Sequence, residues 1–206
     1  MHGVQALLFD LGGVLIDVDF NRVLTHWQPV SRLSLPAMQA AFRADIPYQQ
    51  HERGELSAAG YFAHVRELLQ LQADDARLAQ GWNAIFGDEI TETRLLVQAS
   101  RARFRCCAFS NTNALHQVAW TARYPEVVQS FEHVFVSHEI GLRKPEREAF
   151  DHVARELGLA PEEILFFDDL QENVDGALAA GLQAVLVRSP KDVRDALVVP
   201  HPVPGV

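Results

Sequence analysis

The sequence predicts an α/β protein built on a doubly wound parallel sheet, with a small α-helical segment inserted after the first strand. Short apolar runs alternate along the chain with stretches of helical apolar spacing, which is the pattern of a parallel sheet covered by helices on both faces. Between about residues 20 and 88 this alternation stops and helical spacing alone is found. We therefore expect a core domain of residues 1–18 and 89–206 and an inserted helical domain of residues 19–88.

The first strand is expected over residues 5–10, because the run before Asp10 is apolar throughout, as in a strand that is buried on both faces. Gly12 and Gly13 follow the carboxylate and would let the backbone approach a bound group. Open α/β sheets bind ligands at the carboxyl ends of their strands. An exposed Asp in an ordinary turn would give the same local pattern, so the interpretation of Asp10 depends on the later strands.

The inserted segment contains four stretches of helical spacing, two of which begin at residues suited to cap a helix, Ser57 and Asp74. Its polar run from Gln50 to Glu55 is expected to form a loop between these helices. Large aromatic residues usually fill cores, and we expect that role for Trp27, Phe62, Trp82 and Phe86. The four stretches are residues 21–27, 35–43, 57–71 and 74–86.

The alternation of helices and strands resumes at residue 91. Pro145 is suited to the first turn of a helix and Gly158 to the end of that helix. The tail from Val198 to Val206 contains prolines and is expected to be irregular. The further helices are expected over 91–101, 113–122, 145–158 and 171–180, and the strands over 104–109, 133–137, 164–167 and 184–187.

Composition excludes several classes of function. A formal net charge of −9 argues against nucleic acid as a partner, because a phosphate backbone would be repelled, whereas a small phosphate needs local positive charge alone. No apolar run approaches the roughly 18 residues of a membrane span, and the early first strand leaves no room for a signal peptide, so we expect a cytoplasmic protein. Cys106 and Cys107 are neighbours on a strand and are expected to be buried, reduced thiols.

Polar residues also stand at or just after the ends of the later predicted strands. Ser110 and Asn111 end the second strand of the core, where a hydroxyl and free N–H groups can hold a phosphate oxygen, although the same residues commonly cap helices. Lys144 follows the third strand and is either a neutralising cation or an ordinary surface lysine. Asp168 and Asp169 end the fourth strand, and adjacent carboxylates of this kind suit a hard cation such as Mg²⁺.

These groups form a set that is complete for phosphoryl transfer. A carboxylate can act as the nucleophile and form an aspartyl-phosphate, while a hydroxyl and a lysine hold the phosphoryl group and a pair of acids binds the metal. The sequence therefore predicts a Mg²⁺-dependent phosphatase that acts on a small phosphorylated metabolite.

Four segments occur in the order found in the haloacid dehalogenase-like hydrolases, which this sequence resembles over nearly its whole length. They are FDLGGVL, SNT, RKP and FFDDLQEN. The helical insert matches the cap domain of the subfamily whose cap follows the first motif. The segments DLGGVLIDVDFNRVL, HERGELS, SNTNALH and GLRKPE are further similar to a group of bacterial sugar 1-phosphate phosphatases, which implies a sugar phosphate as substrate.

The resemblance implies a role for each group at the strand ends. Asp10 would be the nucleophile and would bind Mg²⁺ through its other oxygen, together with the backbone carbonyl of Gly12 and the carboxylate of Asp169. Asp168 would reach the metal through water, and Asn173 would lie close by. The phosphoryl group and the substrate would be held by Ser110, Asn111, Lys144, His51, Glu52 and Arg53.

One departure from the family pattern concerns the general acid. Most phosphatases of the family carry a second Asp two residues after the nucleophile, and this chain has Gly12 there. The chain therefore lacks the usual proton donor, and two alternatives stay open: a metal-independent dehalogenase with the same nucleophile, and a catalytically weak protein that binds a phosphorylated ligand. The residues considered as replacements for the acid are Asp17, Asp19, His51 and Glu52.

Overall fold

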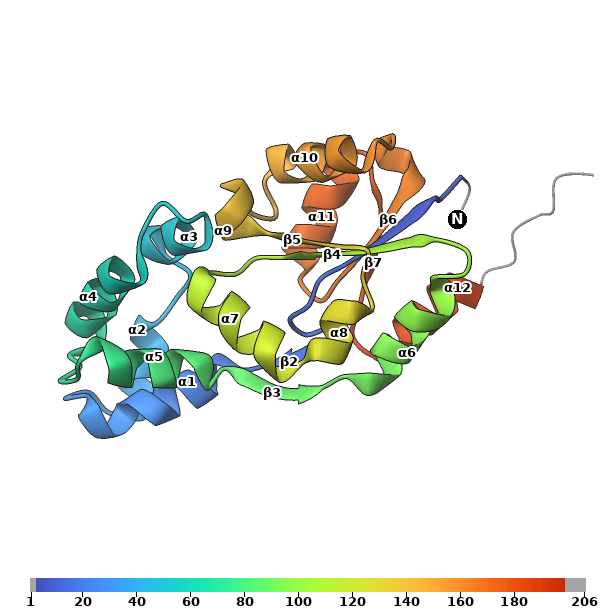
Figure 1. Cartoon of the computed structure of the whole chain (residues 1–206). Coiled ribbons are helices and arrows are strands. Elements are labelled where there is room, and N and C mark those ends of the chain that lie inside the picture. The colour runs from blue at the N-terminus through green and yellow to red at the C-terminus, as the bar shows by residue number, and fades with distance from the viewer. Residues whose placement is uncertain (1–2, 199–206) are drawn as a thin grey trace, which may run out of the picture.

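The apolar runs form a five-stranded parallel sheet whose central strand leads into Asp10, as predicted (Figure 1). The computed structural model describes residues 3–198. The strand order is β5-β4-β1-β6-β7. The strands are β1 (Ala6–Phe9), β4 (Arg105–Ser110), β5 (His133–Val136), β6 (Ile164–Asp168) and β7 (Gln183–Leu186).

The order of the strands brings three polar strand ends together. The chain passes from β1 outward to β4 and β5 on one side and then returns to β6 and β7 on the other. The order thus reverses at β1, and crevices at such reversal points are where open α/β sheets bind ligands. Because β1 pairs in parallel with β4 and β6, Asp10 lies between Ser110 and Asp168 at one edge of the sheet.

Helices cover both faces of the sheet, and the alternation along β1 decides which side chains meet them. Leu7 and Phe9 pack with residues of the first group of helices, whereas Ala6 and Leu8 pack with the second. The first group is α6 (Thr91–Ser100), α7 (Ala114–Arg123), α8 (Pro125–Gln129) and α12 (Pro190–Val198). The second is α10 (Arg147–Leu157) and α11 (Gln171–Ala179), and a short α9 (Ser137–Ile140) follows β5.

The two cysteines follow the same alternation. Cys106 belongs to the apolar cluster on one face and Cys107 to the cluster on the other. Both are buried and free, as the sequence predicts.

The inserted segment has an apolar cluster of its own, in which Trp27 and Trp82 stack and Phe62 is buried. It is joined to the sheet by a two-stranded antiparallel ribbon of β2 (Ile16–Val18) and β3 (Phe86–Glu89) (Figure 1). Its helices are α1 (Phe20–Trp27), α2 (Leu35–Ala41), α3 (Ile46–Glu52), α4 (Ala58–Leu69) and α5 (Asp75–Asn83), with a 3₁₀ turn at Gln28–Val30.

The ribbon is fixed to the end of α7. Arg123 donates to the carbonyl oxygens of Phe86 at 2.9 Å and Gly87 at 2.7 Å, and the Tyr124 hydroxyl also donates to Gly87 at 2.7 Å. These bonds tie β3 to the residues at the end of α7.

The structure corrects several predicted elements. The helix expected over 74–86 ends at Asn83, because residues 86–89 must be extended to pair with β2. Gln50 to Glu52 are helical instead of looped, because Asp45 caps α3 by accepting from Tyr48 N–H. The sequence reading also missed α8, α9 and α12, and the helix expected from Pro145 begins at Arg147.

A 3₁₀ turn at Pro161–Glu163 precedes β6. The tail expected to be irregular lies beyond the described residues from position 199 onward. Within residues 3–198, no helix has the length and apolar character needed to cross a bilayer.

Candidate active site

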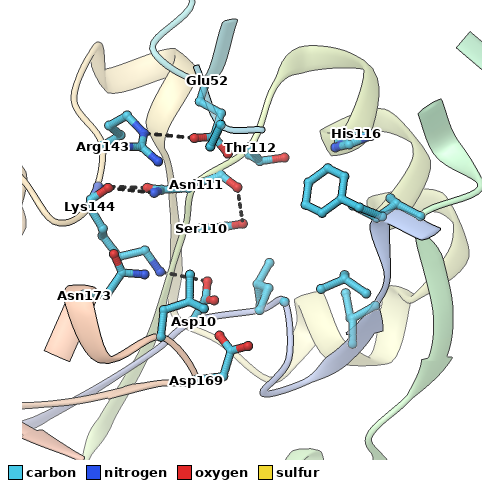
Figure 2. Close-up of a pocket in the computed structure, with 18 of the residues that line it drawn as sticks. Asp10, Glu52, Ser110, Asn111, Thr112, His116, Arg143, Lys144, Asp169 and Asn173 are labelled. Atoms are coloured by element: carbon cyan, nitrogen blue, oxygen red, sulfur yellow. Dashed lines mark hydrogen bonds and ion pairs between the residues drawn. The ribbon is translucent and has the colours of Figure 1, made fainter. Parts of the chain in front are cut away.

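The ends of β1, β4 and β6 open into a cavity of about 370 Å³ that is closed on its far side by the inserted helices and the ribbon (Figure 2). One end of the cavity is polar and holds the groups from the strand ends. The other end is largely apolar. The polar end is lined by Asp10, Gly12, Ser110, Asn111, Thr112, Lys144, Asp169, Glu172 and Asn173.

Lys144 is the buried cation of the polar end. Its Nζ lies 2.8 Å from Asp10 Oδ1 and 2.8 Å from Asp168 Oδ2, and it donates to the carbonyl oxygen of Phe109 at 2.9 Å. The side chain of Asn111 holds the lysine backbone at both polar atoms, each at 2.9 Å. Burial favours the neutral amine, but the carboxylates of Asp10 and Asp168 outweigh it and raise the pKa of Lys144, so the group stays an ammonium.

Three carboxylates meet around this lysine. Asp10, Asp168 and Asp169 each offer an oxygen, and these oxygens lie within 4.8 Å of one another. Burial, with the neighbouring acids, raises the pKa of Asp10 to about 7 and that of Asp169 to about 6. Asp168 is held separately by two bonds of 3.0 Å from Asn173 Nδ2 and one of 2.9 Å from Leu170 N–H.

The acidic cluster fits a divalent cation with oxygen ligands. Mutual repulsion of Asp10 and Asp169 is the interaction that such a cation removes. Asn173 Oδ1 is buried without a partner in the described chain and can accept a bond from a water held there. Gly13 has a φ of +70°, and a Cβ at this position would lie 2.1 Å from Asp169 Oδ2, so a side chain there would displace the acid.

The Ser110 hydroxyl is available to a ligand. Its hydrogen bond within the protein is a long contact of 3.5 Å to the carbonyl oxygen of Asn111. Ser110 is buried, is the last residue of β4 and lies at the cavity wall. The next helix is capped by Asn113, which accepts from His116 N–H at 3.1 Å, so Ser110 is not needed as the cap.

The far end of the cavity combines apolar walls with a few polar groups that bond within the protein. Glu52 from α3 pairs with Arg143 at 2.9 Å, and Tyr48 from the same helix also lines this end of the cavity. His116 Nε2 donates to the carbonyl oxygen of Trp82 at 3.1 Å, and burial lowers the pKa of His116 to about 3, so the ring is neutral. The apolar wall is formed by Ile16, Val18, Phe20, Ile85, Phe86 and Trp120.

Of the three residues at the end of α3 that were expected to contact substrate, Glu52 lines the cavity, whereas His51 and the cap residue Arg53 do not. The loop expected there is a helix, in which consecutive side chains point in different directions. His51 stacks on Tyr61 and bonds the carbonyl oxygen of Leu56 at 2.9 Å. Arg53 pairs with Glu55 and Glu146, so we correct the placement of His51 and Arg53.

The replacements considered for the general acid are also separated by the structure. Asp17 pairs with Arg22, and Asp19 caps α1 by accepting from Asn21 N–H. Neither lines the cavity, whereas Glu52 does.

The sequence reading missed Tyr48, Phe86, His116 and Arg143 as residues of the cavity wall. Arg143 stands next to Lys144 in the sequence and could have been noted from that position. Phe86 packs against the apolar cluster of the insert, as expected, and is half-buried because it also lines the cavity. No sequence pattern marks Tyr48 and His116 as residues of the cavity, because their positions depend on how the inserted helices pack on α7.

Comparison with known proteins gives concordant matches. A sequence model described as haloacid dehalogenase-like hydrolase matches residues 4–181. A phosphatase of Mycobacterium tuberculosis is 35% identical to this chain, and the match covers 95% of this chain and 92% of the relative. A D-ribitol-5-phosphate phosphatase of Bacteroides thetaiotaomicron is 22% identical, and the match covers 95% of this chain and 98% of the relative. A HAD family enzyme mutant from the same organism, crystallised with magnesium and inorganic phosphate, has a TM-score of 0.83 and 26% identity, covering 95% and 99%.

Proposed function

Because this chain belongs to the haloacid dehalogenase-like hydrolase family, we propose that it hydrolyses phosphate monoesters of small metabolites through an aspartyl-phosphate at Asp10. The observation that carries the proposal is the position of Asp10 at the end of the central strand, 2.8 Å from the buried Lys144 ammonium. The weakly bonded hydroxyl of Ser110 and the carboxylate of Asp169 lie in the same cavity. Phosphatases among the relatives support the same reaction class.

In the proposed reaction, Ser110 and Lys144 hold the phosphoryl oxygens while an oxygen of Asp10 attacks phosphorus. The bond from phosphorus to the ester oxygen breaks, and the alcohol leaves with a proton from solvent. Water then attacks phosphorus, which releases inorganic phosphate and restores the carboxylate. Asp168 bonds Lys144 Nζ and the Asn111 side chain bonds the lysine backbone, so both keep Lys144 in place, and Asn111 also lines the cavity beside the phosphoryl group.

We propose Asp10, Asp169 and the backbone carbonyl of Gly12 as the groups that hold Mg²⁺, with Asp168 reaching it through water. The ion supplies positive charge next to the phosphoryl group when it is bound. The acid cluster, the unpartnered Asn173 Oδ1 and the close approach at Gly13 support this assignment.

Sugar phosphates are the proposed substrates, with α-D-glucose 1-phosphate as the first candidate. The sequence resembles bacterial α-D-glucose-1-phosphate phosphatase, and one relative is named for D-ribitol 5-phosphate. Gly12 gives an independent reason, because a site without a general acid favours a leaving group that is itself more acidic. An anomeric oxygen is such a group, since the ring oxygen withdraws electron density from it.

Metal removal tests this function. With Mg²⁺ present, we expect the protein to release phosphate from 4-nitrophenyl phosphate and α-D-glucose 1-phosphate. Chelation with EDTA should abolish the release and added Mg²⁺ should restore it, because Asp10 and Asp169 then again repel the dianionic substrate. Free phosphate is measured in a continuous assay.

Two further measurements, of chloride release and of phosphate binding, could contradict the proposal. Chloride release from 2-chloropropionate without metal would favour the dehalogenase alternative. Binding of inorganic phosphate without any turnover would favour the weak ligand-binding alternative that Gly12 leaves open.

A further inference from the structure

Arg143 has hydrogen-bond donors that the protein itself does not use. Its Nε donates to Glu52 Oε2 at 2.9 Å, and no residue between positions 3 and 198 accepts from either terminal nitrogen. The side chain is 12% exposed and lines the cavity. The donors that the protein leaves unused are thus on a side chain of the cavity wall, where a ligand can supply an acceptor to them.

The charge of the pair decides which acceptor fits. Arg143 and Glu52 together are neutral, so a second anionic group would meet the Glu52 carboxylate as well as the guanidinium. A hydroxyl suits both partners, because it can accept from a terminal N–H of Arg143 and donate to Glu52. Figure 2 shows the pair facing each other on the side of the cavity away from Asp10 and Asp169. It therefore stands where the leaving group, and not the phosphoryl group, would lie.

We propose that Arg143 is a specificity-determining residue that binds a hydroxyl group on the leaving group of the substrate, with Glu52 as the residue that positions it. The inference rests on the proposed phosphatase function and names its substrate class as polyhydroxylated phosphate monoesters. The apolar wall that includes Phe20 and Phe86 complements the C–H face of such a molecule. Because Glu52 belongs to α3 and Arg143 to the segment after β5, the subsite forms when the inserted helices lie against the sheet domain.

A neighbouring ion pair provides a matched control. Arg53 also belongs to the α3 end and also pairs with the segment after β5, through Glu146 at 2.8 Å. Arg53 does not line the cavity, and its Nε is held by Glu55 at 2.7 Å. Arg53→Met therefore removes an ion pair between the same two parts of the chain without touching the proposed subsite.

The test compares kcat/KM on two kinds of substrate for the wild type and for the Arg143→Met, Arg143→Lys, Glu52→Gln and Arg53→Met variants. One substrate is the fastest of α-D-glucose 1-phosphate, D-glucose 6-phosphate and D-ribitol 5-phosphate, and the other is 4-nitrophenyl phosphate, which has no hydroxyl group. For Arg143→Met we expect the ratio of sugar phosphate to aryl phosphate to fall about 10- to 100-fold, chiefly through KM. Arg143→Lys should recover part of this loss, and Glu52→Gln should also lower the ratio. Arg53→Met should change kcat/KM on both substrates by the same factor and leave the ratio as in the wild type.

Three outcomes would overturn the inference. Arg143→Met or Arg143→Lys could lower both rates by one factor, Arg53→Met could shift the ratio as far as Arg143→Met does, or the wild type could hydrolyse the aryl phosphate and none of the three polyol phosphates. Thermal unfolding of each variant separates these results from loss of the fold. Failure of the proposed function is a different result, namely no Asp10-dependent turnover of 4-nitrophenyl phosphate by the wild type.

Discussion

Replacing Asp10 by Asn is expected to lower phosphate release at least about a thousandfold, because the amide cannot form the acyl phosphate. The substitution keeps the shape of the side chain, so the position at the end of β1 should be retained. It also removes a carboxylate whose charge is disfavoured by burial and by the nearby Asp168 and Asp169, and Lys144 keeps its ion pair with Asp168, so the folded protein should not lose stability. Turnover of 4-nitrophenyl phosphate at saturating Mg²⁺ measures the first effect, and denaturant unfolding measures the second.

Asp17→Asn is the matched control for this variant. Asp17 is the next carboxylate along the chain, lies in β2 and is partly exposed beside Arg22, outside the cavity. We expect its rate to stay within about threefold of the wild type, since a surface ion pair contributes little. An Asp10→Asn protein that keeps a tenth of the activity would mean that another residue is the nucleophile.

Replacing Lys144 by Met should lower both activity and stability. Lys144 neutralises Asp10 and Asp168, and all three are removed from solvent, with side-chain exposures of 1% for Lys144 and 0% for Asp168. Removing one partner of a buried ion pair leaves the other charge uncompensated, which costs about 3–5 kcal/mol. Loss of the ammonium also removes a phosphoryl contact, so we expect kcat/KM to fall at least about a hundredfold.

Lys191→Met is the control for the stability effect. Lys191 also pairs with an Asp, but it lies exposed on α12, where solvent already screens the charges. Its free energy of unfolding should match that of the wild type within error. If Lys144→Met unfolds at the same denaturant concentration as Lys191→Met, the buried pair with Asp168 does not stabilise the fold.

The sheet and the polar end of the cavity could be read from the sequence because both follow from local rules. An apolar run between polar segments forms a buried strand, and parallel strands place their carboxyl ends at one edge. Asp10, Ser110 and Asp168 therefore had to converge once the strands were placed. The position of Lys144 was harder to predict. It depends on two hydrogen bonds between the Asn111 side chain and the Lys144 backbone, which are far apart in the sequence.

The far end of the cavity could not be read in this way. Glu52 and Arg143 are separated by 91 positions and meet because α3 packs on the segment after β5. The run around Glu52 is polar, and a polar run predicts a loop unless the cap at Asp45 is recognised. The same limit explains β3, since Phe86 to Glu89 are extended through pairing with β2 and not through an apolar pattern of their own.

Chemical trapping of the intermediate tests the central claim most directly. The wild-type protein is mixed with substrate and Mg²⁺, quenched within the first turnover and treated with borohydride, which reduces an acyl phosphate to an alcohol. The account predicts homoserine at position 10 in the peptide mass spectrum, and no such product without substrate or in Asp10→Asn. Rapid phosphate release with an unmodified Asp10, or with the phosphoryl group on Ser110, would contradict it.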